Sequence, residues 1–286
     1  MIAKTLKFHL LGICLLFSVD LLFAQKQYDS YSGLVMAGYQ GWFNSPTDGA
    51  DRGWYHYRGK NGFQPGSTNI DFWPDVNAYQ VTYDSPFLTK EGQAAKLYSA
   101  HDYSSVNLHF KWMQQYGIDG VFMQRFVGEI ANPSGRNHFN TVLTSAIRSA
   151  YEFDRAICVM YDLSGIKDGD DKILMDDVAA LEKEWNLKKR DRAKTYLFQH
   201  GKPLIAVWGI GFNDGRKYNL KTAERIVNYL EQNGYSVLLG VPTYWRELRQ
   251  DTESDPFLHE LIKKSDIIMP WFVGRYNQAG FDQFKS

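Results

Sequence analysis

The stretch "IDGVFMQRF", at positions 118–126, decides the fold of this chain. Its centre is apolar, and polar side chains enter only near its end, at Gln124 and Arg125. Short continuous apolar runs of this kind are typical of parallel strands that are buried on both faces. A second run of the same type, "AICVMYDL" at 156–163, follows after a segment with helical periodicity. Together the two runs predict a parallel sheet.

The same alternation of strand-like and helical segments extends over most of the chain. Repeated βα units predict right-handed crossovers and an α/β fold of the (β/α)8 TIM-barrel type. Such a barrel has eight strands, whereas the sequence contains seven strand-like runs. We therefore expect the last βα unit to be missing. Residues 44–91 are rich in glycine, proline and aromatic residues, and we expect a long ordered insertion there, after the first strand. The apolar runs lie at 34–43, 96–102, 118–126, 156–163, 204–212, 236–245 and 267–273.

Residues 1–24 have the pattern of a signal peptide. Two lysines precede an apolar run at 10–23, which ends at the small residue Ala24. Cys14 lies in the middle of this run, which does not favour lipoprotein anchoring. We therefore expect export to the periplasm or the extracellular space, and a single incomplete TIM-barrel domain over 25–286. No other segment is long and apolar enough to span a membrane.

Composition narrows the classes of partner. The 32 basic and 32 acidic residues cancel, and no basic stripe is present, so nucleic acid is not an expected partner. The chain contains no HExxH motif, CxxC motif or histidine cluster, and no complete dinucleotide fingerprint, so neither a metal nor a cofactor is expected. Cys158 is the only cysteine outside the predicted signal peptide, so no disulfide within the chain is expected.

Aromatic residues are abundant, with 8 tryptophans and 18 tyrosines. Sugar-binding clefts use such residues, because a ring face stacks on C–H groups while polar atoms bond hydroxyl groups. We therefore expect a glycan substrate, and a monomer if the chain is complete.

Chemistry in a parallel barrel lies at the carboxyl ends of the strands, and every predicted strand here ends in polar or aromatic residues. Burying so many polar groups unpaired costs about 1–3 kcal/mol each, so a polar cleft lined by aromatic rings explains them better than a closed core. Asp162 and Asp102 are the candidate catalytic carboxyl groups. The candidates for binding substrate are Tyr39, Gln40, Trp42, His101, Gln124, Arg125, Tyr161, Trp208, Tyr244, Trp245 and Trp271.

Some of these residues also have structural interpretations. Asp162 could cap the following helix or pair with Arg125, and His101 could bond only to the backbone. Core packing instead of stacking on a sugar is the alternative for Trp208, Tyr244, Trp245 and Trp271.

Five motifs taken together resemble one group of proteins. They are "AGYQGWF" (37–43), "IDFWPD" (70–75), "YSAHD" (98–102), "LHFKWMQQYGIDGVFMQRF" (108–126) and "MYDLSG" (160–165). They resemble bacterial proteins similar to glycoside hydrolase families 71 and 99, over roughly residues 33–276. The resemblance implies a (β/α)8 barrel that acts on glycans: α-mannosides in family 99, whose members are retaining and endo-acting, and α-1,3-glucans in family 71.

The resemblance also bears on the catalytic residues. In family 99 the substrate's own 2-hydroxyl acts as the nucleophile, assisted by a carboxylate pair in an acidic motif after the eighth strand, and this sequence contains no such motif. A family 99 carboxylate that contacts the sugar after strand four corresponds to Asp162. Independently, Asp102 and Asp162 could form a pair, since glycoside hydrolysis needs two carboxyl groups across the bond.

The favoured hypothesis is thus an exported glycoside hydrolase that acts on an α-mannan, α-1,3-glucan or hemicellulose type of glycan. The alternative is a truncated barrel that binds glycans without hydrolysing them, and a third possibility is an open barrel that a partner chain completes.

Overall fold

The computed structural model describes residues 26–191 and 193–275, so the predicted signal peptide lies outside the described residues. Within them, six parallel strands form one sheet in the order β1-β4-β5-β7-β8-β9, and the short β6 (Phe198–Gln199) pairs antiparallel with β7. The six strands are β1 (Met36–Tyr39), β4 (Gly120–Phe126), β5 (Ala156–Asp162), β7 (Lys202–Trp208), β8 (Ser236–Val241) and β9 (Ile267–Pro270).

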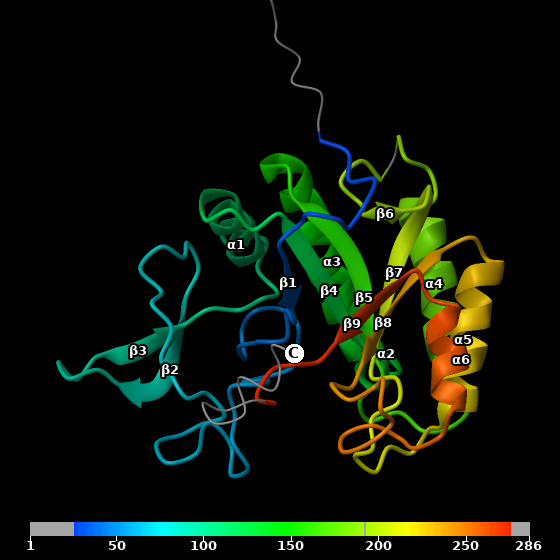
Figure 1. Cartoon of the computed structure of the whole chain (residues 1–286). Coiled ribbons are helices and arrows are strands. Elements are labelled where there is room, and N and C mark those ends of the chain that lie inside the picture. The colour runs from blue at the N-terminus through cyan, green and yellow to red at the C-terminus, as the bar shows by residue number, and fades with distance from the viewer. Residues whose placement is uncertain (1–25, 192, 276–286) are drawn as a thin grey trace, which may run out of the picture.

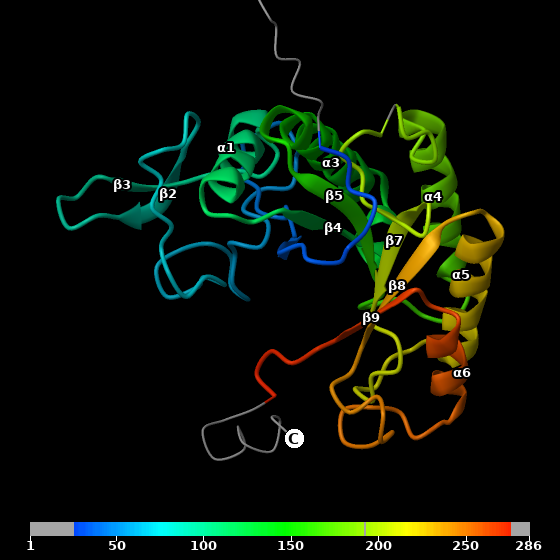
Figure 2. The same ribbon diagram turned by 45° about the horizontal axis from the view of Figure 1, so that its top comes forward.

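Helices lie along one side of this curved sheet, and the other side is concave (Figures 1 and 2). The described part of the chain is therefore a half-barrel with an outer helical layer. The helices are α1 (Tyr103–Gln115), α2 (Val127–Ile130), α3 (Pro133–Phe153), α4 (Asp171–Trp185), α5 (Leu220–Gln232) and α6 (Phe257–Lys263).

Local sequence signals explain where the longer helices begin and end. Asn132 caps α3 by accepting a hydrogen bond from the Gly135 N–H, and Pro133 occupies the first turn, where its missing N–H costs nothing. Asp154 ends the helix in the left-handed conformation. Asn219 caps α5 in the same way as Asn132 caps α3.

Alternation along the strands divides the apolar residues between two cores. One set, including Val121, Val159 and Val207, packs against the helices. The intervening set, including Phe122 and Met160, forms a second cluster on the concave side. Both sets are almost fully buried, which explains why the sequence of these strands shows continuous apolar runs rather than alternation.

The predicted second barrel strand, at 96–102, is wrong. Its first residues belong to β3 (Ala94–Leu97), which pairs antiparallel with β2 (Tyr83–Leu88) in a separate two-stranded sheet. In the main sheet β1 pairs directly with β4. The sequence contained the signal, because exposed Lys96 stands between two buried residues, as in an antiparallel strand with one solvated face.

The segment between β1 and α1 carries its own aromatic cluster. Tyr57 is buried there, its hydroxyl donates to the Tyr98 carbonyl, and its ring contacts Phe43, Trp54 and Phe63. This packing gives the predicted insertion a small core that adjoins the half-barrel.

β1 and β9 form the two edges of the sheet, and each pairs with a single neighbour in the main sheet of the described chain. A half-barrel of six strands thus replaces the seven-stranded arrangement predicted from the sequence. None of the helices within 26–275 is long and apolar enough to cross a membrane.

Candidate active site at the strand ends

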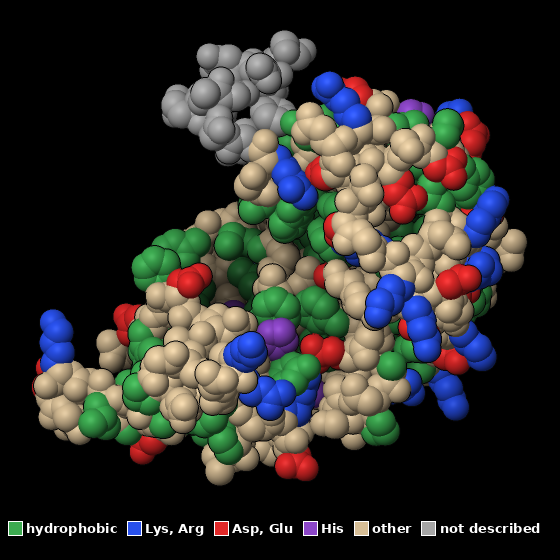
Figure 3. All heavy atoms as spheres, turned by 90° about the horizontal axis from the view of Figure 1, so that it is seen from below, with side chains coloured by type: hydrophobic (Ala, Val, Ile, Leu, Met, Phe, Trp, Pro, Cys, Tyr) green, Lys and Arg blue, Asp and Glu red, His purple; other side chains and the backbone are tan. Residues whose placement is uncertain are grey.

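The carboxyl ends of β4, β5 and β7 bring three of the predicted residues to the concave side. Asp162 and Trp208 are partners in the β5–β7 register, so they lie at one level of the sheet. Gln124 pairs with Met160, two residues before Asp162, and so lies one level below on the neighbouring strand. Met160 and Trp208 both belong to the concave-side cluster, and the two-residue period places Asp162 on the same side. Seen from the strand ends, the molecule is hollowed near its centre, and hydrophobic side chains line the hollow (Figure 3).

Trp208 owes its position to Gly240 on β8. A Cβ atom at Gly240 would lie 2.5 Å from Cδ1 of the indole, so only glycine leaves room for this ring. The ring of Trp271, after β9, meets that of Trp208 edge-on, with centroids 5.5 Å apart. The two tryptophans form an aromatic corner at the ends of β7 and β9.

Two polar atoms of this group are buried and have no hydrogen-bond partner, namely Nε1 of Trp208 and Oε1 of Gln124. One is a donor and the other an acceptor. A buried polar group without a partner costs about 1–3 kcal/mol, and native proteins keep few of them. Both atoms lie on the side of the sheet that carries Asp162, where hydroxyl groups of a ligand can bond to them.

Asp162 is only 6% exposed. Its Oδ1 accepts a hydrogen bond from the Ser164 N–H at 2.7 Å. Burial raises the pKa of this carboxyl group, while the hydrogen bonds from Ser164 and the charge of Arg216 act in the opposite direction. The net rise favours the protonated form, in which the group can donate a proton. Asp162 does not pair with Arg125, one of the alternatives left open by the sequence.

The loop after β7 adds two residues that the sequence analysis missed, Arg216 and Tyr218. The guanidinium of Arg216 lies 5.3 Å from the Trp208 ring and donates to the Tyr218 hydroxyl, which in turn donates to the Gly209 carbonyl. Gly209 has φ +112, and a Cβ there would come within 3 Å of both side chains. Only the glycine after Trp208 hinted at this close approach. The loops after β5 and β7 enclose a cavity of about 280 Å³ beside Arg216.

Tyr244 and Trp245, which follow β8, line a larger cavity of about 480 Å³ together with Pro270 and Phe272 at the end of β9. The backbone N–H of Trp271, between those two residues, donates to the Val241 carbonyl at 2.9 Å. This cavity therefore adjoins the aromatic corner.

Trp42 stands over the end of β4. Its ring stacks on His56 at 3.9 Å and on Phe126 at 5.2 Å between centroids, and Phe126 is the register partner of Asp162. Glu129, just beyond β4, forms ion pairs with Arg52 and, at 3.5 Å, His56. Although burial alone would raise the pKa of Glu129, these contacts lower it. The insertion thus packs against the strand ends through Trp42.

His101 and Asp102 lie between the β2–β3 hairpin and α1. The His101 ring stacks on His138, with their Nδ1 atoms 3.2 Å apart, and the two oxygens of Asp102 accept from the Tyr83 hydroxyl at 2.9 and 3.1 Å. Burial raises the pKa of Asp102. None of these contacts involves Asp162, whose pKa is raised by burial and partly lowered again by the charge of Arg216.

Arg125 and Tyr161 are buried on the helix side of the sheet, so their predicted contact with substrate does not fit the structure, whereas Tyr39 faces the same side but also lines a small cavity at the end of β1. Arg125 is 1% exposed, and its guanidinium donates twice to Asp177 of α4. The Tyr161 hydroxyl donates to the same carboxylate. The Tyr39 hydroxyl lies 2.8 Å from Nδ1 of His109 on α1. Successive residues of a strand point to opposite faces of the sheet. Each of these three residues is next to a position that faces the concave side, so its own side chain faces the helices.

Gln40 is exposed directly after β1 and lines a small cavity of about 100 Å³ with Trp42. It therefore stays at the rim of the strand-end region.

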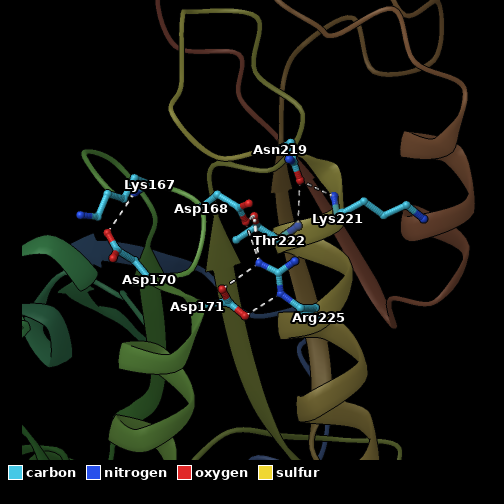
Figure 4. A network of polar contacts seen from close by, with 8 residues as sticks. All are labelled: Lys167, Asp168, Asp170, Asp171, Asn219, Lys221, Thr222 and Arg225. Carbon is cyan, nitrogen blue, oxygen red and sulfur yellow. Dashed lines mark hydrogen bonds and ion pairs between the residues drawn. The ribbon is translucent and has the colours of Figure 1, made fainter.

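An acidic turn between β5 and α4 is tied to α5 (Figure 4). Arg225 donates to Asp168 at 2.7 Å and to both oxygens of Asp171 at 2.8 and 2.9 Å. The guanidinium thus pairs with two of the acidic side chains of the turn. No group of three or more histidine, cysteine or acidic side chains within the described ranges is placed to hold a metal ion.

Comparisons with known proteins give fold-level similarity only. No protein family matches the sequence, and no curated protein matches it either. A GH99 endo-α-mannosidase from Bacteroides thetaiotaomicron, solved with BIS-TRIS-propane, is similar at 13% identity and a TM-score of 0.48, over 83% of this chain and 58% of that one. A second structure of a GH99 endo-α-mannosidase from that organism gives 10% identity and a TM-score of 0.40, over 82% and 83% of the two chains.

The 3-keto-D-glucoside 4-epimerase of E. coli, in its apo form, gives 13% identity and a TM-score of 0.34, over 63% of this chain and 82% of that one. The chain spans little more than half the length of the first of these structures. Similarity at this level does not assign the chain to a family.

Proposed function

We propose that this protein is a glycoside hydrolase whose concave strand-end site binds a glycan around Asp162. The observation that carries the proposal is that a buried carboxyl group and two buried polar atoms without a hydrogen-bond partner lie on the same side of the sheet. The carboxyl group is that of Asp162, and the two atoms belong to Trp208 and Gln124. Sugar hydroxyl groups can both donate to Gln124 and accept from Trp208. The aromatic corner formed with Trp271 supplies ring faces and edges for stacking on the sugar.

For hydrolysis, we propose Asp162 as the proton donor to the leaving group, because its raised pKa keeps the carboxyl group protonated at a higher pH than usual. The second carboxyl group predicted from the sequence is Asp102, and we retain it as a proposal. Burial raises the pKa of Asp102, and the hydrogen bond that it accepts from the Tyr83 hydroxyl opposes part of that rise, in the direction of the ionised form that a base requires.

The favoured substrates are those implied by the sequence resemblance, α-mannan or α-1,3-glucan, with hemicellulose as a further candidate. We also propose export with removal of residues 1–24. The intact mass of the protein from its source cells tests this, because retention of the full 286 residues would contradict cleavage.

The function is tested by calorimetric titration with α-mannan, α-1,3-glucan and xylan oligosaccharides, together with an assay for released reducing ends. We expect Asp162→Asn and Trp208→Phe to weaken binding by about tenfold each, since the first replaces a carboxyl oxygen by an amide NH2 and the second removes the indole N–H from a buried site. Trp208→Phe keeps a ring, so the protein should stay folded. Hydrolysis should be lost in Asp162→Asn and Asp102→Asn.

Trp73→Ala and Asp176→Asn are the matched controls, because Trp73 lies on the insertion and Asp176 is exposed on α4. Binding that is equal in the wild type and both site variants would reject the site. Binding without any release of reducing ends would favour the alternative, a glycan-binding barrel without hydrolysis.

A further inference from the structure

The cavity at the ends of β8 and β9 is lined by both arginine and aromatic side chains. Arg246 and Arg249 line it together with the rings of Tyr244 and Trp245. The Arg246 guanidinium lies 5.0 Å from the Trp245 ring, and that of Arg249 lies 5.4 Å from the Tyr244 ring. Each ring therefore has a cation against it at the wall of one cavity.

We infer that this cavity is a subsite for an anionic group on the glycan, a carboxylate, sulfate or phosphate. The inference rests on the proposed function and adds a substrate class to it. A guanidinium presents a planar fork of donors that matches such oxyanions, and a neighbouring aromatic face suits the sugar ring that carries the anion.

Neither guanidinium is neutralised by a carboxylate within residues 26–191 or 193–275. Among the residues that the structure describes, no carboxylate lies within ion-pair distance of Arg246 or Arg249, and both side chains are exposed. Arg275, by contrast, pairs with Asp251 at 3.1 Å in the same region. The two cavity arginines thus keep their donors available for a ligand.

The loop does not need these arginines to hold its shape. Asp251 accepts hydrogen bonds from the backbone N–H groups of Thr243 and Tyr244, both at 3.3 Å, and the hydroxyl of Thr243 donates to the Trp271 carbonyl. Because the carboxylate of Asp251 and the hydroxyl of Thr243 fix the loop, the cavity walls are formed before a ligand arrives.

The local charge favours an anion. The cavity lining contains two positive groups, Arg246 and Arg249, and one negative group, Glu247. The adjacent Asp251 and Arg275 cancel each other. The remaining charge is positive, although the whole chain is formally neutral.

The place of the cavity connects it to the site around Asp162. Trp271 hydrogen-bonds through its backbone to the end of β8 and meets Trp208 with its ring. If one sugar unit of a glycan binds at the aromatic corner, a following unit would reach the cavity lined by Tyr244 and Trp245.

The test compares glucose and mannose with their uronate, 6-sulfate and 6-phosphate forms, with dissociation constants measured by ligand-observed NMR. We expect at least one anionic form to bind about tenfold more tightly than its neutral parent, as one charge-assisted pair provides. The Arg246→Gln/Arg249→Gln variant should lose this preference. Glu247→Gln should strengthen it, because that change removes the opposing charge. The best-bound form identifies the anion.

Arg148→Gln is the matched control, because Arg148 also lies over an aromatic ring, that of Tyr103 at 4.2 Å, but on α3. Equal binding of anionic and neutral sugars, or a preference that survives in the double variant, would overturn the inference. If neutral oligosaccharides then still bind through Asp162, the proposed function stands alone. If neither class of glycan binds, both proposals fail.

Discussion

At the scale of single residues, the face of the strand decides which predicted side chains can meet a ligand. Gln124, Asp162 and Trp208 lie on the concave side, whereas Arg125 and Tyr161 bind Asp177 on the helix side. The sequence located all of them at strand ends. It could not separate the two faces, because both faces of these strands are buried and the runs carry no alternation of polarity.

Other residues of the site gave no usable signal. Arg216 lies on a loop eight residues beyond Trp208, and only the three-dimensional course of that loop brings it to the indole ring. In the sequence, Gly240 is only one small residue within an apolar strand. In the structure, its lack of a side chain makes room for the ring of Trp208. Such contacts depend on neighbouring strands, which local sequence does not specify.

Two histidines, the buried His138 and the partly buried His109, make the stability of the fold depend on pH. Burial lowers the pKa of His109, between the hydroxyls of Tyr39 and Tyr79, and that of His138, beside His101, to about 4. Their pKa in the unfolded chain is about 6.5, so the unfolded state binds more protons between pH 6.5 and 4. Stability is therefore complete above pH 6.5 and falls as the pH decreases, by up to about 3 kcal/mol for each histidine.

Urea unfolding between pH 7.5 and 5 measures this effect. We expect His109→Gln to be less stable than the wild type at pH 7.5 but to lose less stability toward pH 5. His200→Gln is the control variant, because the His200 side chain is 65% exposed. Equal slopes for His109→Gln and the wild type would contradict the assignment of the pH dependence to buried histidines.

At the scale of elements, six of the seven predicted strands lie in the parallel sheet. The continuous apolar runs identified them because strands covered on both faces have no polar positions in their middle. The segment at 96–102 stands at the expected βα spacing, which predicts a parallel strand, whereas the exposed Lys96 between buried neighbours belongs to an antiparallel hairpin. The insertion was located by composition, but its hairpin of β2 and β3 depends on pairing between segments that composition does not describe.

The contact between β7 and β8 allows a sharp test. Gly240→Ala would place a methyl group 2.5 Å from the Trp208 ring, so we expect the free energy of unfolding to fall by about 1–3 kcal/mol and glycan binding to weaken. Gly38→Ala on β1 is the matched control, because a Cβ there meets nothing within 4 Å. Urea unfolding and the oligosaccharide titration measure the two effects.

Equal stability of the two alanine variants would show that the Trp208 ring is not held against Gly240. Loss of stability in Gly38→Ala would instead indicate that alanine itself is poorly tolerated at strand positions of this sheet.

At the scale of the whole molecule, the fold separates a rigid outer layer from a concave side that carries the polar groups. On the outer side, helices α3, α4 and α5 bury the sheet and hold the Arg125–Asp177 pair. On the concave side, the site around Asp162, the cavity beside Arg246 and the packing of Trp42 against the insertion all lie at the strand ends. The site around Asp162 and the cavity beside Arg246 therefore share one end of one sheet.

The central claim is that a glycan binds at the carboxyl ends of β4, β5 and β7. The most direct measurement is a crystal structure of the protein with an oligosaccharide that binds in solution. We predict sugar hydroxyl groups within hydrogen-bonding distance of Asp162, Nε1 of Trp208 and Oε1 of Gln124, the two last atoms being unpartnered without ligand. An oligosaccharide bound elsewhere, with these three groups untouched, would contradict the claim.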